Sequence, residues 1–317
     1  MNIKCGIIMD PIDQINIKKD SSFAILLEAQ KRKYNIYYME LHNLYLKNNK
    51  AYAKTKILFI NNTQEKHFHF VDELDIPLSN LDVIFMRKDP PVNMEFIYAT
   101  YILEHAEQEG VLIVNKPSNL RNCNEKIYTT YFPDLIPDTL ISQNNIQIKN
   151  FINKHQDVII KPLNAMGGNS IFRIQILDPN VSVIIETMTK NNTHFCLVQQ
   201  YLPDIIYGDK RIIIIDGQPI PLCLARIPPT GETRGNLAAG GIGKVQKINE
   251  NDFKIAKILS PFLIEKGLII VGIDVIGTKL TEINITSPTC ICEIQTKSDI
   301  CITKLILNAI EKKLDKK

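Results

Sequence analysis

Residues 271–290 read VGIDVIGTKLTEINITSPTC and predict a β-hairpin. The apolar runs 271–276 and 280–285 are its expected strands, joined by a turn at 277–279. Asp274, Glu282 and Asn284 interrupt the apolar pattern. Because side chains alternate between the two faces of a strand, a three-residue turn pairs Asp274 with Glu282 and directs all three oxygen donors to one face. A two-residue turn reverses that parity, so the turn length decides whether these residues form a site.

Oxygen donors grouped on a rigid sheet suit magnesium, which proteins commonly hold through one or two carboxylates together with substrate phosphates. The alternative is a solvated sheet face with ordinary surface acids. The polar segment Ser287-Pro288-Thr289 follows the second strand at once. Functional residues are concentrated in such loops, so the segment favours the metal site.

The pattern of Asp, then Glu-x-Asn, resembles the magnesium site of ATP-grasp ligases, and the string TEINITSPTC resembles the bacterial glutathione synthetases of that superfamily. The resemblance runs from MDPI at 9–12 to the last helix. It implies an α/β protein with an N-terminal parallel-sheet (pre-ATP-grasp) domain and a two-lobed α+β ATP-grasp fold. We expect the first domain at 1–122 and the ATP-grasp domain at 123–317, with lobes of about 123–200 and 201–317.

Composition limits the other possibilities. The chain has 317 residues, 45% of them apolar, and a net charge of +3. It contains no run of about 18 apolar residues, and its first residues lack the features of a signal peptide, so we expect a cytoplasmic protein with no membrane partner. The small net charge argues against a nucleic-acid partner. The seven scattered cysteines argue against a disulfide framework.

The first residues predict a β-α-β unit of a parallel sheet. An apolar strand at 3–9 is followed by a helix at 23–33 and a second strand at 36–39. The unit has no G-x-G-x-x-G turn, so no dinucleotide site is expected. Residues 41–80 show no clear period and are predicted to be irregular.

A charged loop, Arg87-Lys-Asp-Pro-Pro91, follows the predicted strand 83–86. Ligands of open parallel sheets bind at this carboxyl end of the strands, and arginine offers a two-pronged donor to a carboxylate. A solvated turn is the alternative. MRKDPP and the helix predicted at 94–109 resemble the family, whose N-terminal domain helps to bind the dipeptide, and this implies that Arg87 binds substrate.

Two lysines are candidates for the ATP phosphates. Lys126 falls on a helix predicted at 118–131, and Lys161 ends a strand predicted at 157–161 before the loop PLNAMGGNS. Glycine-rich backbone and a nearby lysine both favour anions. An exposed helix charge and a plain hairpin are the alternatives. The resemblance implies phosphate contacts for these lysines and for the loop glycines Gly167 and Gly168. Asn164 and Ala165 depart from the family pattern, which has Asp-Gly there.

The resemblance also assigns the nucleoside end of ATP. A strand predicted at 196–200 runs into Tyr201-Leu202-Pro203. In ATP-grasp proteins this linker reads the adenine edge. The residues implied around the base are Gln199, Gln200, Tyr201 and Leu202, and the residue implied near the ribose is Asp209.

Residues 228–243, PPTGETRGNLAAGGIG, contain five of the fourteen glycines of the chain. Such a segment forms no stable helix or strand, so a mobile loop is predicted, either a linker or a lid. Arg234 inside it and Arg226 before it favour a lid, and the string resembles the lid of the glutathione synthetases. The resemblance implies that Arg211, Arg226 and Arg234 stabilise an acyl phosphate and a tetrahedral intermediate. Ile242, Lys244 and Cys292 depart from the family pattern.

The resemblance implies that ATP, γ-glutamylcysteine and glycine are converted to glutathione, ADP and phosphate, with Mg²⁺ or Mn²⁺ held by Asp274, Glu282 and Asn284. It also implies a homo-oligomer. Two alternatives stay open: an ATP-grasp ligase for another peptide, and a nucleotide-binding regulatory module without catalysis.

Overall fold

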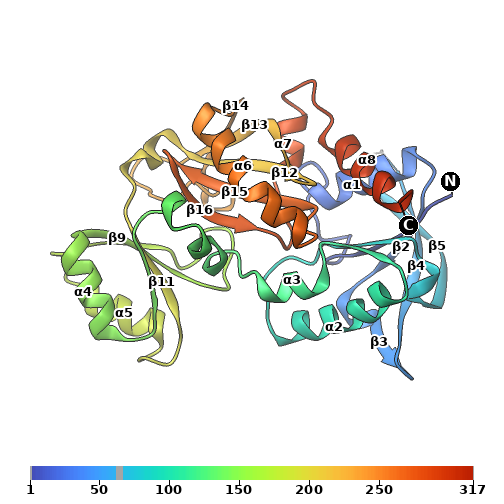
Figure 1. Ribbon diagram of the computed structural model, residues 1–317, viewed down its shortest axis with the longest axis horizontal. Coiled ribbons are helices and arrows are strands. Elements are labelled where there is room, and N and C mark those ends of the chain that lie inside the picture. Colours follow the sequence, from blue (N-terminus) through green and yellow to red (C-terminus); the bar gives the residue numbers. More distant parts are fainter. Residues whose placement is uncertain (1, 62–66, 317) are drawn as a thin grey trace.

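The protein is elongated, and its three sheets follow one another along the long axis (Figure 1). The structure is a computed structural model that describes residues 2–61 and 67–316. In Figure 1 the N-terminal sheet lies at one end, a small middle lobe at the other, and the C-terminal lobe between them. No helix in these two described ranges is long and apolar enough to span a bilayer.

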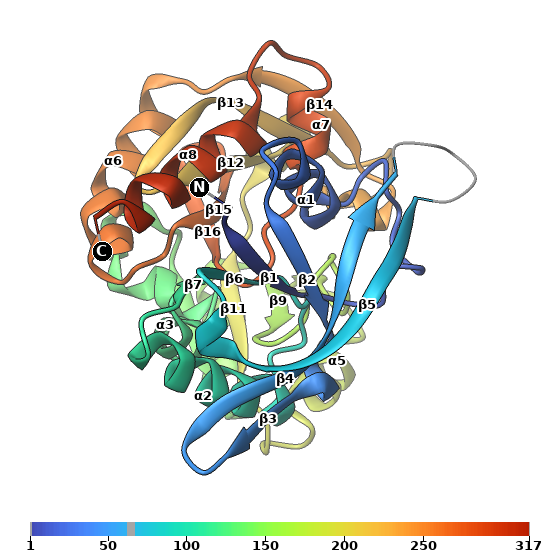
Figure 2. The ribbon, with the colours of Figure 1, turned by 90° about the vertical axis from the view of Figure 1, so that its right-hand side faces the viewer.

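The N-terminal sheet has seven strands, in the order β3-β4-β2-β1-β6-β7 with β5 paired to β4 (Figure 2). Its parallel part is formed by β1 (Lys4–Ile8), β2 (Asn35–Met39), β6 (Val83–Met86) and β7 (Leu112–Val114). The helices α1 (Ser21–Lys31) and α2 (Met94–Gln108) alternate with these strands. Asp20 caps α1, accepting a hydrogen bond from Phe23 N. The predicted β-α-β opening of a parallel sheet is confirmed.

The prediction of an irregular segment at 41–80 is wrong. It contains three antiparallel strands: β3 (Leu44–Lys47), β4 (Lys50–Ile60) and β5 (Phe68–Pro77). The outer strand β5 is mostly half-buried or exposed and carries charged residues, so it lacks an alternating apolar pattern. Pairing with the preceding strand β4 at the edge of the sheet stabilises it, and its side-chain pattern does not indicate such pairing.

The middle lobe is an antiparallel sheet in the order β10-β9-β11-β8. Its elements are β8 (Thr139–Ser142), α4 (Asn145–His155), β9 (Asp157–Pro162), β10 (Phe172–Gln175), α5 (Val181–Thr189) and β11 (Cys196–Gln200). Figure 1 shows both helices on the outer side of this sheet. The other side is therefore free to face the C-terminal lobe.

The C-terminal lobe holds an antiparallel sheet in the order β14-β13-β12-β15-β16. Its elements are β12 (Asp209–Ile215), β13 (Gln218–Ile227), β14 (Ile242–Lys247), α6 (Glu250–Glu265), β15 (Ile270–Ile276), β16 (Lys279–Asn284), α7 (Ile291–Gln295) and α8 (Ile302–Leu314). Asp216-Gly217 forms the tight turn between β12 and β13, and both residues have positive φ, 46° and 77°.

The helix predicted at 118–131 is instead two short elements. The helix α3 spans Pro117–Asn122 and begins with its proline, and the 3-10 helix η3 spans Ile127–Tyr131. Between them Asn124 Oδ1 accepts hydrogen bonds from the backbone N–H groups of Lys126 and Ile127. This local turn competes with the helix, which is the reason for the break. The other 3-10 turns are η1 (Leu41–Asn43), η2 (Leu78–Asn80), η4 (Pro133–Leu135), η5 (Pro203–Tyr207) and η6 (Leu237–Ala239).

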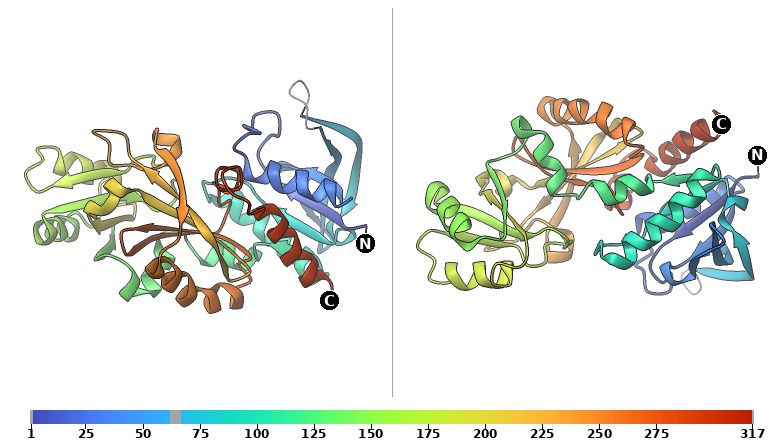
Figure 3. Two further views of the ribbon diagram at one scale, coloured as in Figure 1. Left: turned by 90° about the horizontal axis from the view of Figure 1, so that it is seen from above. Right: turned by 60° about the horizontal axis from the view of Figure 1, so that its bottom comes forward.

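The last helix returns to the N-terminal sheet. In Figure 3, α8 runs beside α1, far from the middle lobe. Arg32 on the end of α1 forms an ion pair with Glu311, whose other oxygen accepts a hydrogen bond from Tyr34 (2.8 Å in each case). These contacts hold the N-terminal sheet against the C-terminal lobe, where the site is built.

Candidate active site

The hairpin β15–β16 places Asp274 directly opposite Glu282. The predicted pairing is therefore confirmed, but the predicted three-residue turn is wrong. The turn has two residues, since Ile276 pairs with Lys279, and a β-bulge at Leu280–Thr281 adds the residue that restores the parity. Thr281 Oγ1 donates a hydrogen bond to Asp274 O, which holds the bulge.

The acids of the hairpin lie among buried cations. Arg211 on the neighbouring strand β12 grips Asp274 through two hydrogen bonds of 2.5 and 3.0 Å, and Arg226 Nη2 lies 2.9 Å from the same carboxylate. Arg226 also pairs with Asp209. Strand register explains this cluster, because Arg211 lies opposite Asp274 and Asp209 lies opposite Arg226. Asn284 Nδ2 donates to Asp274 Oδ2 (3.2 Å), so the three predicted metal ligands are brought together.

The cluster determines how its acids titrate. Burial alone would raise the pKa of Asp274, but Arg211 and Arg226 outweigh it and hold this pKa well below its usual range. Burial likewise opposes ionisation of Glu282, and the nearby lysines still lower its pKa. Burial raises the pKa of Asp209 to about 7, because the attraction of Arg226 is partly cancelled by the other two carboxylates. Asp274 and Glu282 are therefore ionised at neutral pH.

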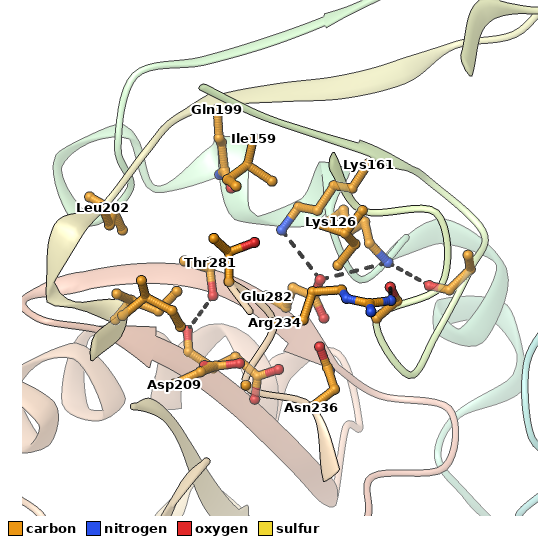
Figure 4. A pocket seen from close by; sticks show the side chains of 18 of the residues that line it. Lys126, Ile159, Lys161, Gln199, Leu202, Asp209, Arg234, Asn236, Thr281 and Glu282 are labelled. Carbon is orange, nitrogen blue, oxygen red and sulfur yellow. Dashed lines mark hydrogen bonds and ion pairs between the residues drawn. The ribbon is translucent and has the colours of Figure 1, made fainter. Parts of the chain in front are cut away.

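Two lysines meet Glu282, Lys161 from the middle lobe and Lys126 from the start of η3, which packs against β16. Lys161 Nζ at the end of β9 lies 3.3 Å from Glu282 Oε1, and Lys126 Nζ lies 3.8 Å from the same oxygen (Figure 4). Lys126 also donates to Ala165 O (2.8 Å) in the glycine-containing loop. Both ammonium groups are buried, so they form a desolvated positive region beside the acids.

A cavity between the middle and C-terminal lobes collects the residues assigned to the nucleotide. All nine line it, together with Asp274, Glu282 and Arg234: Lys126, Lys161, Gly167, Gly168, Gln199, Gln200, Tyr201, Leu202 and Asp209. In Figure 4, Lys126, Lys161 and Arg234 lie on one side of the cavity and Leu202 on the other, an arrangement that suits a molecule with a flat ring and a phosphate chain.

The apolar part of this cavity includes residues that the sequence reasoning missed. These are Ile159, Ile171, Ile205 and Ile276, with Met166 from the loop. Ile159 precedes Lys161 by two residues on β9, and side chains two residues apart share a face. Strand alternation therefore identifies Ile159 once Lys161 is placed, but the other four come from separate elements and need the fold.

A second cavity adjoins the first one. Both cavities are lined by Glu282 and by residues of the loop and lid, while Arg211, Arg226 and Asn284 line only the second. Its lining also contains Lys19 and Asp89, from loops of the N-terminal domain, and Glu293 from α7. The predicted catalytic arginines are thus divided: Arg234 lines the nucleotide cavity, and the other two line its neighbour.

The predicted lid connects β13 to β14. Since β14 begins at Ile242, the loop spans 228–241 and ends two residues earlier than expected. Arg234 Nη1 donates to Gly168 O (3.2 Å), so the lid touches the glycine-containing loop. A Cβ on Gly235 would lie 2.2 Å from Arg226 O. Glycine is needed there because the lid backbone approaches β13, the strand that carries Arg226, so closely.

Arg87 lies behind the second cavity and does not line it. Its side chain is 3% exposed, and it donates to Ser22 Oγ (2.9 Å) and to Pro288 O (3.0 Å). The remaining nitrogen, Nη1, is buried without a partner. Arg87 therefore holds the 287–289 segment against the start of α1.

The departures from the family pattern have local explanations. Ala165 does not adopt positive φ, whereas Gly167 and Gly168 do, at 69° and 83°. The loop uses only the backbone carbonyl of Ala165, so its side chain is accommodated. Cys292 is buried, and its thiol lies 3.3 Å from Asp20 O, at the cap of α1. Ile242 is 66% exposed on β14.

Comparison with known proteins agrees with this geometry. The sequence model of the prokaryotic glutathione synthetase N-terminal domain matches residues 3–121, and that of the prokaryotic glutathione synthetase ATP-grasp domain matches residues 125–299. The glutathione synthetase of Buchnera aphidicola subsp. Acyrthosiphon pisum (strain APS) is 60% identical over 314 residues, which cover 99% of this chain and 98% of that protein. The glutathione synthetase of Escherichia coli (strain K12) is 58% identical over 312 residues, covering 98% and 99%.

Solved structures share the fold at much lower identity. D-cycloserine synthetase DcsG superposes with a TM-score of 0.69 at 12% identity, covering 98% of this chain and 99% of that one. D-alanyl-alanine synthetase A from Vibrio cholerae O1 biovar eltor gives a TM-score of 0.60 at 12% identity, with all of both chains covered. The chain has the ATP-grasp fold and belongs to the prokaryotic glutathione synthetase family.

Proposed function

We propose that this protein is a glutathione synthetase, an ATP-dependent carboxylate–amine ligase that joins γ-glutamylcysteine to glycine. The observation that carries the proposal is the pair of adjoining cavities that meet at Glu282. One has the shape and charge for a nucleotide, and the other offers cations for an acidic peptide. The full-length identity to curated glutathione synthetases supports this choice of substrates.

The reaction has two steps. An oxygen of the cysteinyl carboxylate attacks the γ-phosphorus of ATP, the bond to the bridging oxygen breaks, and ADP leaves. The lone pair of the glycine amine then attacks the acyl carbon of the resulting acyl phosphate, inorganic phosphate leaves, and the nitrogen loses its extra proton. A free carboxylate is a poor electrophile, so phosphorylation provides the leaving group. Positioning and charge stabilisation carry the rate.

We assign the phosphates of ATP to Lys126, Lys161 and the backbone at Gly167-Gly168. These lysines now face Glu282 and would turn toward the more strongly charged triphosphate. The linker 199–202 and the adjacent isoleucines are proposed to hold the adenine, and Asp209 to lie near the ribose.

We assign the acyl phosphate to Arg226 and Arg211 on the sheet and to Arg234 on the lid. The first two are held by Asp274, and Asp209 adds a second partner for Arg226, so both guanidinium groups are oriented in advance. Such preorganised charge stabilises negative charge that develops on the transferred phosphoryl group. Arg87 is proposed to support the dipeptide side through the segment that it holds.

We propose that Asp274, Glu282 and Asn284 hold a divalent cation. The hairpin brings two carboxylates and an amide together, and carboxylate and amide oxygens are donors that Mg²⁺ and Mn²⁺ prefer. The Asn284 amide, whose nitrogen faces Asp274, would turn its oxygen to the cation. When bound, such a cation would neutralise phosphate charge. We further propose a domain division at residues 122–123 and a homo-oligomeric state, both on family resemblance.

Phosphate release tests the proposal. The purified protein should release phosphate from ATP only when γ-glutamylcysteine and glycine are both present. If ATP binds but no dipeptide supports turnover, the protein is a regulatory module. Strong preference for another peptide or amine would instead indicate a ligase of different specificity.

A further inference from the structure

One carboxylate of the second cavity has no partner. Glu293 is carried by α7, and its Oε2 is buried without a hydrogen bond. No lysine, arginine or histidine in the described parts of the chain pairs with it. A buried carboxylate oxygen without a hydrogen-bond donor costs free energy, so this oxygen favours a ligand that brings a donor from outside the chain.

The other acids that line this cavity differ from Glu293. Glu125 Oε1 accepts three hydrogen bonds from Ile285 N, Thr286 N and Thr286 Oγ1, at 3.0, 3.1 and 2.7 Å. Glu282 faces two lysines. Asp89 is half-buried, and neither of its carboxylate oxygens is a buried atom without a partner. Among the described acids of the cavity, only Glu293 combines burial of an oxygen with the lack of a partner.

The cations that line the cavity are either paired with other residues or exposed to solvent. Arg211 is gripped by Asp274, and Arg226 is shared between Asp209 and Asp274. Lys19 lines the same wall as Glu293 but is exposed. An ammonium group on the ligand is therefore the chemical partner that Glu293 lacks.

Glu293 is also fixed in place. Its neighbours Ile291 and Ile294 are fully buried, and Cys292 Sγ lies 3.3 Å from Asp20 O at the cap of α1. The side chain is therefore carried by a rigid element that packs against α1. Glu293 lines only the second cavity, whereas Glu282 lines both cavities.

We propose that Glu293 binds the α-ammonium group of the glutamyl residue of the dipeptide and thereby selects the γ-linkage; this rests on the proposed function. In γ-glutamylcysteine the ammonium and its carboxylate lie together at the end remote from the cysteinyl carboxylate. In the α-linked isomer the ammonium is next to the peptide bond, nearer the reacting end. An acid that lines only the second cavity, and not the nucleotide cavity, would accept the first arrangement and leave the second unpaired.

Steady-state kinetics with two dipeptides test the assignment. The second dipeptide is glutarylcysteine, which differs from γ-glutamylcysteine only in lacking the ammonium group. Glu293→Gln should raise KM for γ-glutamylcysteine by about 10- to 100-fold, the range for losing a hydrogen bond to a charged group, and leave KM for glycine and ATP within about twofold. The wild type should lose a similar factor on glutarylcysteine, and Glu293→Gln should lose almost none.

Asp89→Asn is the matched control, because it removes one negative charge from the same cavity. It should keep the preference of the wild type for the ammonium-bearing dipeptide. Equal discrimination by the wild type and Glu293→Gln, a KM effect on glycine instead, or the same loss in Asp89→Asn would overturn the assignment. If Glu293→Gln does not fold, wild type that uses both dipeptides equally well still overturns it. Absence of any turnover of γ-glutamylcysteine by the wild type would instead overturn the proposed function.

Discussion

Asn115 pairs with Ile270 as one strand residue pairs with another: its Oδ1 accepts from Ile270 N (3.0 Å) and its Nδ2 donates to Ile270 O (2.8 Å). The same side chain accepts from Ile269 N and donates to Ile285 O, both at 2.7 Å. Asn115 follows the last parallel strand of the N-terminal sheet, while Ile270 and Ile285 lie at the base of the hairpin. One buried amide thus connects that sheet to the two strands that carry the acids.

Asn115→Ala should lower the free energy of unfolding and the rate of turnover. The substitution leaves buried backbone groups of the hairpin base without partners, which costs about 3 kcal/mol of unfolding free energy. Urea unfolding measures this loss. Asn119→Ala is the control, since Asn119 makes a single amide contact, to Lys266 O. A loss of unfolding free energy no larger than that of Asn119→Ala would show that the hydrogen bonds of the Asn115 side chain do not stabilise the hairpin.

Glu282→Gln should nearly abolish turnover while the fold stays intact. The amide keeps the shape of the side chain but removes one of two charged donors proposed for the cation, so half-maximal activity should need much more Mg²⁺. Thermal unfolding and Mg²⁺ titrations check both parts. Glu265→Gln, on the exposed end of α6, serves as control. A near-normal rate with unchanged Mg²⁺ demand would exclude Glu282 as a ligand.

Asp209→Asn should flatten the pH dependence of stability. The folded pKa of Asp209 is raised to about 7 from the ordinary 3.8, so between these values the folded state binds a proton that the unfolded state releases. Its contribution to the unfolding free energy therefore falls as pH rises from about 4 to 7 and is constant above. Urea unfolding of the nucleotide-free protein from pH 4.5 to 8 measures the slope, with exposed Asp299→Asn as control. The same slope in Asp209→Asn and the wild type would contradict this.

Gly235→Ala should displace the lid. The added Cβ would lie 2.2 Å from Arg226 O, and backbone at that position has no flexible side chain to move away. We expect a large loss of turnover with little loss of global stability. Gly231→Ala is the matched control: no atom lies within 4 Å of the position of its Cβ, so only the positive φ of 83° is strained. Equal effects of both substitutions on turnover would show that the close approach of Gly235 to Arg226 O does not determine the position of the lid.

Strong local signals made much of the fold predictable. The capped helix after Asp20, the tight turn at Asp216-Gly217 and the apolar parallel strands each depend on neighbouring residues. The edge strand β5 was missed because its charged, largely exposed sequence has no alternating apolar pattern. The helix after Pro117 was predicted too long because Asn124 starts a competing turn.

The candidate site was predictable where residues share one element. Asp274 and Glu282 do face each other, but the turn that brings them together has two residues, and the bulge at Thr281 has no distinct pattern in the sequence. The cross-strand pairs of Arg211 with Asp274 and Arg226 with Asp209 depend on register between separate hairpins. The missing partner of Glu293 is visible only once every neighbour is in place.

The last prediction concerns the 228–241 lid. Arg234 joins it to the glycine-containing loop through Gly168 O and is itself held by Glu232 (2.6 Å). An acyl phosphate open to water would hydrolyse, so Arg234→Ala should increase the ATP consumed per glutathione formed or slow the reaction strongly. Glu232→Gln is the control, because it keeps the arginine and weakens only contacts within the lid, namely the ion pair with Arg234 and the hydrogen bonds from Thr233 N and Arg234 N. In the wild type, ATP with dipeptide should protect the lid from an unspecific protease, since closure offsets the entropy cost of its glycines. Equal cleavage with and without these substrates, and unchanged coupling in Arg234→Ala, would show that the segment is a linker.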